Sequence, residues 1–171
     1  MIIYQDSKAG FLHDISNNYF KARIEDAFVR QTGSLPIDAR GWANDYTRFS
    51  TVLDDAKVDD DIQLAIEYHC SPVGRYRIDV ILAGNDGTTD NGVIIELKAW
   101  DTAGVTDVEN MVYSPIGGGT NTQHPSHQAL KYKGMILLRG LHVQSLPPKS
   151  GTAGRQPLRS PAQGFASLLS R

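Results

Sequence analysis

The chain has 171 residues, of which 40% are hydrophobic and 21% are charged, and its formal net charge is −2. These values are ordinary for a globular protein, and the length is sufficient for one domain with a hydrophobic core. The single cysteine, Cys70, excludes an internal disulfide and suits a reducing compartment. The first residues, Met1 to Asp6, show no basic region followed by an apolar run, and no apolar stretch is long enough to span a membrane. We therefore expect a cytoplasmic protein that does not bind membranes.

The charge is unevenly distributed along the chain. Residues up to Glu109 include all 19 acidic groups and ten basic ones, a balance of −9, whereas the residues after it include seven basic groups and no acid. A basic segment of this kind attracts phosphate backbones. Beyond Leu146 we favour a solvated tail instead, because that segment is rich in Pro, Gly and Ser.

The first third of the chain predicts a short edge strand followed by three helices. Ile2-Ile3-Tyr4 is typical of the strand, Ser7 suits the N-cap of the first helix, and Gly33 suits the end of the second. Apolar residues recur at helical spacing in the second and third helices. The three helices are expected over about residues 8–16, 19–31 and 38–56.

Three strands are expected in the middle of the chain, over about residues 62–70, 76–84 and 92–98. In the first of these, strict alternation would place Leu64, Ile66 and Tyr68 on one face and Glu67 on the other. The nine residues from Gly84 to Gly92 are dense in turn formers, so the last two strands are expected to be neighbours.

Each of the last two strands carries one carboxylate among apolar residues, Asp79 in the first and Glu96 in the second. Lys98 follows Glu96 by two residues and so projects from the same face. If the strands pair, Asp79 lies beside Glu96, and two buried acids are costly unless they bind a cation. A divalent metal site and a structural ion pair at a sheet edge are the two interpretations, and we favour the metal site.

The final third predicts a long loop and a helix. The loop, over about residues 101–123, includes Gly117-Gly118-Gly119 but lacks the lysine of a phosphate-binding P-loop. The helix is expected over about residues 126–138. It places Gln128 and Tyr132, four residues apart, on one face.

These residue types together suit phosphodiester chemistry. Magnesium prefers oxygen ligands, which the carboxylates of Asp79 and Glu96 and the backbone carbonyl of Leu97 offer. Lys98 is suited to hold or help deprotonate an attacking water, or to stabilise a pentacovalent phosphate. Arg75 and Arg77 flank the site and are candidates to contact phosphate or to remain solvated.

The order of these residues resembles a known family. Asp79 followed by Glu96-x-Lys98 resembles the PD-(D/E)XK phosphodiesterase motif, and Gln128-x-x-x-Tyr132 resembles the Gln-x-x-x-Tyr motif of the RecB-like exonuclease branch. The match covers about residues 24–138. Four segments look like the N-terminal nuclease-like domain that precedes helicase-like ATPase modules in some bacterial proteins, namely Ala65–Tyr68, Arg77–Asp79, Val93–Lys98 and His124–Ala129.

The resemblance implies that Asp79 and Glu96 bind Mg²⁺ or Mn²⁺, that they form the catalytic site with Lys98, and that Gln128 and Tyr132 complete it. In this superfamily a glutamate on the helix before the sheet often completes the metal site. Glu25 is the best match to that glutamate, and Glu67 is a second candidate.

The resemblance also implies a restriction-endonuclease-like α/β fold, with N-terminal helices, a mixed central sheet of about four strands and a C-terminal helix. We expect a nuclease-like domain over residues 1–144 and an irregular or disordered basic tail over residues 145–171. The family core continues with a further strand after the Gln-x-x-x-Tyr helix, and the tail does not read as one.

The function implied by the resemblance is metal-dependent hydrolysis of DNA phosphodiester bonds, in DNA processing or anti-phage defence. The alternatives are an inactive nucleic-acid-binding or interaction module with the same fold, and a small-molecule or protein-binding domain with structural acids. The expected partners are DNA, with RNA as a second substrate class, and a helicase-like ATPase. A homodimer is an alternative to a monomer.

Overall fold

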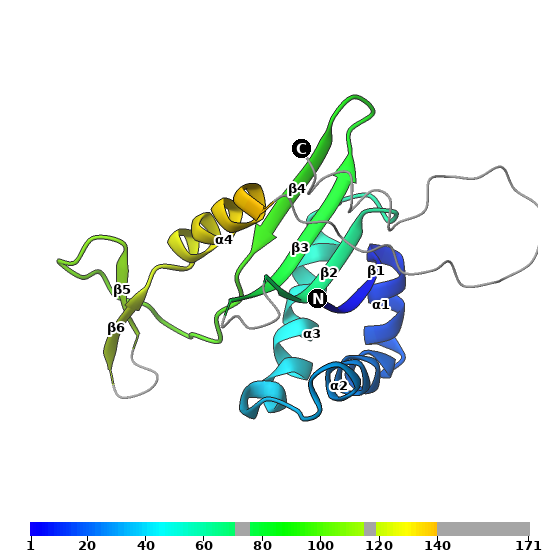
Figure 1. Cartoon of the computed structure of the whole chain (residues 1–171), viewed down its shortest axis with the longest axis horizontal. Coiled ribbons are helices and arrows are strands. Elements are labelled where there is room, and N and C mark those ends of the chain that lie inside the picture. Colours follow the sequence, from blue (N-terminus) through cyan, green and yellow to red (C-terminus); the bar gives the residue numbers. More distant parts are fainter. Residues whose placement is uncertain (71–75, 115–118, 140–171) are drawn as a thin grey trace, which may run out of the picture.

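The computed structural model describes residues 1–70, 76–114 and 119–139 and shows a mixed α/β architecture (Figure 1). The elements are, in chain order, β1 (Ile2–Ser7), α1 (Lys8–Ser16), α2 (Tyr19–Thr32), the 3-10 helix η1 (Ile37–Gly41), α3 (Trp42–Asp55), β2 (Gln63–His69), β3 (Arg77–Asn85), β4 (Asp90–Ile95), β5 (Met111–Ser114), β6 (Thr120–Gln123) and α4 (Pro125–Arg139). The expected tail over residues 145–171 and residues 117 and 118 of the glycine run lie outside the described ranges.

The main sheet has four strands, as predicted, and their order is β1-β2-β3-β4, but the sheet is not mixed. All three strand pairs within the described residues are antiparallel. The prediction of a mixed sheet is therefore wrong for this part of the chain. A parallel pair needs a long crossover connection, whereas β2, β3 and β4 follow one another through short connections.

Two hydrophobic clusters lie on opposite faces of this sheet. The larger one packs α1, α2 and α3 onto one face, around the fully buried rings of Phe11 and Phe20. The smaller one packs α4 onto the other face through Tyr132 and Ile136. The sheet is thus covered on both sides, with α4 beside β4 in Figure 1. This arrangement leaves the end of β4 between helices of both layers.

The local signals in the first third of the chain act as expected. The Ser7 hydroxyl accepts a hydrogen bond from the Gly10 amide at 3.1 Å and caps α1. Gly33 ends α2 with a φ of 87°, which glycine adopts without a steric penalty. The third helix begins later than predicted, because residues 37–41 form the separate helix η1.

Two strands lie within residues 101–123, where the sequence predicted a loop. The strands β5 and β6 pair as an antiparallel hairpin, with Met111 opposite Gln123 and Ser114 opposite Thr120. This hairpin stands apart from the main sheet (Figure 1). Both strands have only four residues, and β6 is entirely polar, so it lacks the apolar patterning that sequence-based strand prediction needs.

Strand alternation breaks at one point in β2 and β3. Ile66 packs with the three N-terminal helices, but Tyr68 packs on the α4 side of the sheet. Between them Glu67 has a φ of 55°, and the register of the flanking pairs places it opposite Asp79. The prediction that Tyr68 shares a face with Ile66, and that Glu67 faces away from both, is therefore wrong. A local irregularity of this kind re-aims side chains, and such irregularities are common beside active sites.

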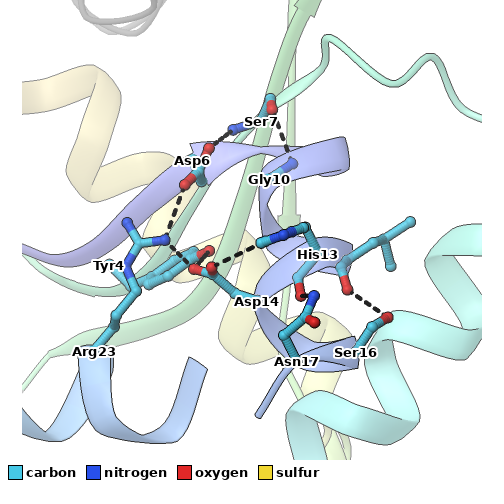
Figure 2. A network of polar contacts seen from close by, with 10 residues as sticks. Tyr4, Asp6, Ser7, Gly10, His13, Asp14, Ser16, Asn17 and Arg23 are labelled. Carbon is cyan, nitrogen blue, oxygen red and sulfur yellow. Dashed lines mark hydrogen bonds and ion pairs between the residues drawn. The ribbon is translucent and has the colours of Figure 1, made fainter. Parts of the chain in front are cut away.

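A polar network joins β1, α1 and α2 (Figure 2). The Tyr4 hydroxyl donates to Asp14 Oδ2 at 2.9 Å, and the Arg23 guanidinium lies 4.9 Å from the Tyr4 ring centre. Arg23 also pairs with Asp14 and, at 3.2 Å, with Asp6. The pKa of Tyr4 is raised by burial and by its bond to Asp14, so the hydroxyl remains a donor. The network fixes how α1 and α2 lie on the sheet.

No helix in the part of the chain that the structure describes combines the length and the apolar character needed to cross a bilayer.

We expect Gly10→Ala to destabilise the fold, although this substitution usually stabilises a helix. A Cβ on Gly10 would lie 2.0 Å from Asp6 Oδ1, and Asp6 is held by Arg23 and the Ser7 amide. Moving Asp6 should lower the free energy of unfolding by about 1–3 kcal/mol, as overpacking does. Denaturant unfolding measures this change.

Gly134→Ala in α4 is the matched control, because nothing lies within 4 Å of its Cβ position. It should raise the free energy of unfolding by about 0.5–1 kcal/mol. Stabilisation by both substitutions would contradict the role given to Asp6.

Candidate active site

A cavity of about 490 Å³ lies where β4 ends. Both helical layers, the strands β2 and β3 and the segment that follows β4 contribute to its wall. It is lined by Trp42, Asp45 and Tyr46 of α3, Glu67 and His69 of β2, Arg77 and Asp79 of β3, Glu96, Leu97 and Lys98 after β4, and Gln128 and Tyr132 of α4. The structure thus brings most of the residues singled out in the sequence to one place.

The carboxylates of Asp79 and Glu96 meet because the β3–β4 ladder stops beside them. The last pair in the register is Val80 with Ile95, so Asp79 and Glu96 occupy the next position. There the Leu97 amide donates to Asp79 Oδ2 at 2.8 Å. A side-chain carboxylate accepts the bond that a backbone carbonyl would accept in a continued ladder, and the chain after Ile95 leaves the sheet.

The Glu96 side chain is only 4% exposed, against 27% for Lys98 beside it. Its Oε1 accepts from Lys98 Nζ at 2.5 Å and from Gln128 Nε2 at 2.6 Å. Its Oε2 is buried and has no hydrogen-bond partner among the residues that the structure describes. Burial and, less strongly, the charge of Asp79 raise the pKa of Glu96, while Lys98 opposes this shift.

The α4 side of the site is held by a hydrogen-bonded pair four residues apart. Gln128 Nε2 donates to the Tyr132 hydroxyl at 2.8 Å as well as to Glu96. Tyr132 is buried, and its pKa is raised mainly by that burial. The two residues therefore orient the Glu96 carboxylate from the opposite layer, which matches their expected position beside the acids.

The two further glutamates proposed as metal ligands lie in different surroundings. Glu67 lines the cavity, 2% exposed, but its Oε1 accepts from the Tyr46 hydroxyl at 2.8 Å and its Oε2 pairs with Arg77 Nε at 2.6 Å. Glu25 is on the outer flank of α2, where its Oε1 lies 4.0 Å from Lys21 Nζ, and it does not line the cavity. The structure brings Glu67 to the site with its own partners and leaves Glu25 outside.

Sequence reasoning missed four residues of the cavity wall, Trp42, Asp45, Tyr46 and His69, of which Tyr46 and His69 bear on the chemistry. Tyr46 was assigned to the helical core face, where it does pack, but its hydroxyl also reaches Glu67. His69 packs against Phe28 with ring centres 5.7 Å apart, and its Nε2 is buried without a hydrogen-bond partner in the described part of the chain. Burial and the nearby Arg77 charge lower the pKa of His69. The signal for His69 is its register position opposite Arg77, which only the strand pairing reveals.

The donor set suits a hard divalent cation held by two acids. Within residues 1–70, 76–114 and 119–139, no group of three or more His, Cys, Asp and Glu side chains is placed to hold a metal. Magnesium is often bound by one or two carboxylates with waters and substrate phosphates, so Asp79 and Glu96 suffice. Glu96 Oε2, which is buried and has no hydrogen-bond partner among the described residues, is the observation that fits binding of a cation.

Comparisons of the chain with protein-family models, with curated proteins and with solved structures found no match.

We expect Glu96→Gln to leave the free energy of unfolding at pH 7 unchanged or to raise it. The pKa of Glu96 is raised above 4.5 in the folded chain, so the folded state binds this proton more tightly than the unfolded state. Ionisation therefore costs stability as the pH rises from 4.5 through the folded-state pKa, and glutamine avoids that cost. Below that window the two proteins should converge, which denaturant unfolding at several pH values would show.

The matched control is Glu25→Gln, which should give no such pH-dependent gain. If Glu96→Gln instead lowers the free energy of unfolding by more than about 1 kcal/mol at pH 7, Glu96 and Lys98 form a stabilising ion pair. The interpretation of these residues as a structural ion pair then holds.

Proposed function

We propose that the protein is a Mg²⁺-dependent nuclease that hydrolyses DNA phosphodiester bonds in this cavity. The observation that carries the proposal is Glu96, a buried carboxylate beside Asp79 with one oxygen that lacks a hydrogen-bond partner. Buried charge without a full set of partners lowers stability, and it is typical of sites that bind a ligand.

Asp79 and Glu96 would hold the metal through their carboxylates, and the Leu97 carbonyl would offer a third oxygen. When bound, Mg²⁺ would lower the pKa of a coordinated water and neutralise charge on the phosphodiester. Lys98 Nζ is fixed 2.5 Å from Glu96 Oε1, so its ammonium lies at the edge of the metal site. From there it would orient the attacking water and stabilise the negative charge that develops on the phosphate.

The supporting residues keep this geometry without touching the substrate. Gln128 holds Glu96 Oε1 and is itself bonded to Tyr132, so the carboxylate cannot rotate freely. Leu97 is tied to Asp79 through its amide. Neighbours of this kind orient metal ligands and tune their affinity.

The order of the elements supports a restriction-endonuclease-like fold as part of this proposal. Helices come first, Asp79 and Glu96 follow on adjacent strands, and α4 follows with Gln128 and Tyr132. The resemblance to nuclease-like domains ahead of helicase-like ATPases supports a role in DNA processing or anti-phage defence, with such an ATPase as a partner.

An inactive nucleic-acid-binding module is the second candidate function. The close Lys98–Glu96 contact favours it, because Lys98 already neutralises one of the two acids. The cleavage experiment separates the two functions.

Lys98→Met is expected to reduce DNA cleavage by at least about 100-fold, since it removes the charge beside the phosphate. Linear, circular and single-stranded DNA would be incubated with Mg²⁺, Mn²⁺ or a chelator, and the products resolved by electrophoresis. Lys131→Met, which removes an exposed lysine of α4, is the matched control and should cleave normally. A protein that shows no metal-dependent cleavage would refute the nuclease assignment, and cleavage that survives the loss of Lys98 would refute the catalytic role of this residue.

Gln128→Met should weaken Mn²⁺ binding by about 10-fold or more, because Glu96 loses the donor that orients it. Isothermal titration calorimetry without DNA measures this affinity. Unchanged Mn²⁺ binding would show that Gln128 does not act through Glu96.

A further inference from the structure

The cavity has a second polar end that the proposed hydrolysis does not use. His69 and Arg77 lie directly opposite each other on β2 and β3, and both line the cavity. Asp79 follows Arg77 by two residues on β3, a separation of about 6.4–6.8 Å in a regular strand. Neighbouring phosphates of a nucleic-acid strand are separated by a similar distance, so the two ends can contact adjacent phosphates.

Arg77 is held in place rather than left in solvent. Its Nε is 2.6 Å from Glu67 Oε2, and Glu67 is only 2% exposed. The Tyr46 hydroxyl fixes the other Glu67 oxygen at 2.8 Å. The guanidinium plane is thereby oriented before any substrate arrives. A planar, pre-oriented guanidinium is well suited to bind phosphate oxygens.

His69 supplies the second observation. Its Nε2 is buried in the cavity wall without a hydrogen-bond partner, while its ring packs on Phe28. A buried nitrogen that lacks a partner lowers stability unless a ligand completes its bonding. A phosphate oxygen beside Arg77 would do so.

We infer that Arg77 and His69 form a phosphate subsite, which binds the nucleic-acid phosphate next to the one that is cleaved, and that Glu67 is the positioning residue of this subsite. The inference rests on the proposed nuclease function for the identity of the ligand. Glu67 thus acts on Arg77 and does not need to bind the metal.

The test is a titration of the full chain with inorganic phosphate in the presence of a chelator. Isothermal titration calorimetry would measure the affinity, and NMR spectra would record the His69 ring resonances. Saturable binding with a shift of the His69 signals is expected. Arg77→Gln alone leaves Glu67 buried without its counter-charge, so the variant to use is the neutral pair Glu67→Gln with Arg77→Gln. This pair and, separately, His69→Gln should weaken phosphate binding by at least about 10-fold, the effect of losing a hydrogen bond to a charged group.

Two controls keep the outcome specific to the subsite. Arg48→Gln removes an exposed arginine of α3 and should bind phosphate normally. Glu96→Gln should not weaken phosphate binding, although it abolishes cleavage. No saturable phosphate binding, or equal binding by the neutral pair, would overturn the subsite even if the protein cleaves DNA. Conversely, phosphate binding that depends on Arg77 in a protein that does not cleave DNA would refute the nuclease and leave the subsite intact.

Discussion

The hydrogen bond from the Leu97 amide to Asp79 Oδ2 is the contact on which the cavity depends. It replaces the next backbone bond of the β3–β4 ladder and turns the chain out of the sheet after Ile95. As a result Glu96 and Lys98 lie beyond the regular sheet, within reach of α3 on one side and α4 on the other. The Asp79 carboxylate thus has a structural role at the strand end, directly beside Glu96.

The charges around that bond suit the binding of a ligand, and they contribute little to the stability of the fold. Asp79 and Glu96 place two negative charges together, and Lys98 offsets one of them. A buried polar atom without a partner costs about 1–3 kcal/mol, and Glu96 Oε2 is such an atom. Glu67, another acid of the cavity wall, is balanced by Arg77 and Tyr46. The excess negative charge is therefore concentrated at Asp79 and Glu96, where a divalent cation would neutralise it.

Local signals predicted much of this structure. Ser7 and Gly33 set helix ends through their own backbone bonds and dihedral angles, so the sequence was sufficient to place them. The proximity of Asp79 to Glu96 followed from a short connection between two apolar strands. Gln128 and Tyr132 shared a face because helical spacing requires it.

The features that were missed depend on tertiary contacts. Glu67 lies on another side of the sheet than predicted, because strand alternation breaks at its positive φ. No residue pattern in β2 indicates this break. Glu25 matched a family position by its place in a helix, but the way α2 packs on the sheet leaves it outside the cavity. The Tyr46 hydroxyl and His69 entered the site through partners on other elements. The antiparallel order of the sheet likewise came from connections that the residue types alone do not specify.

The account is tested most directly by a crystal structure of the chain soaked with Mn²⁺, with the ion located by its anomalous scattering. The account predicts one ion in the cavity, bound by the carboxylates of Asp79 and Glu96, and its loss in crystals of Glu96→Gln. An empty cavity at saturating Mn²⁺, or an ion bound without either carboxylate, would contradict the account.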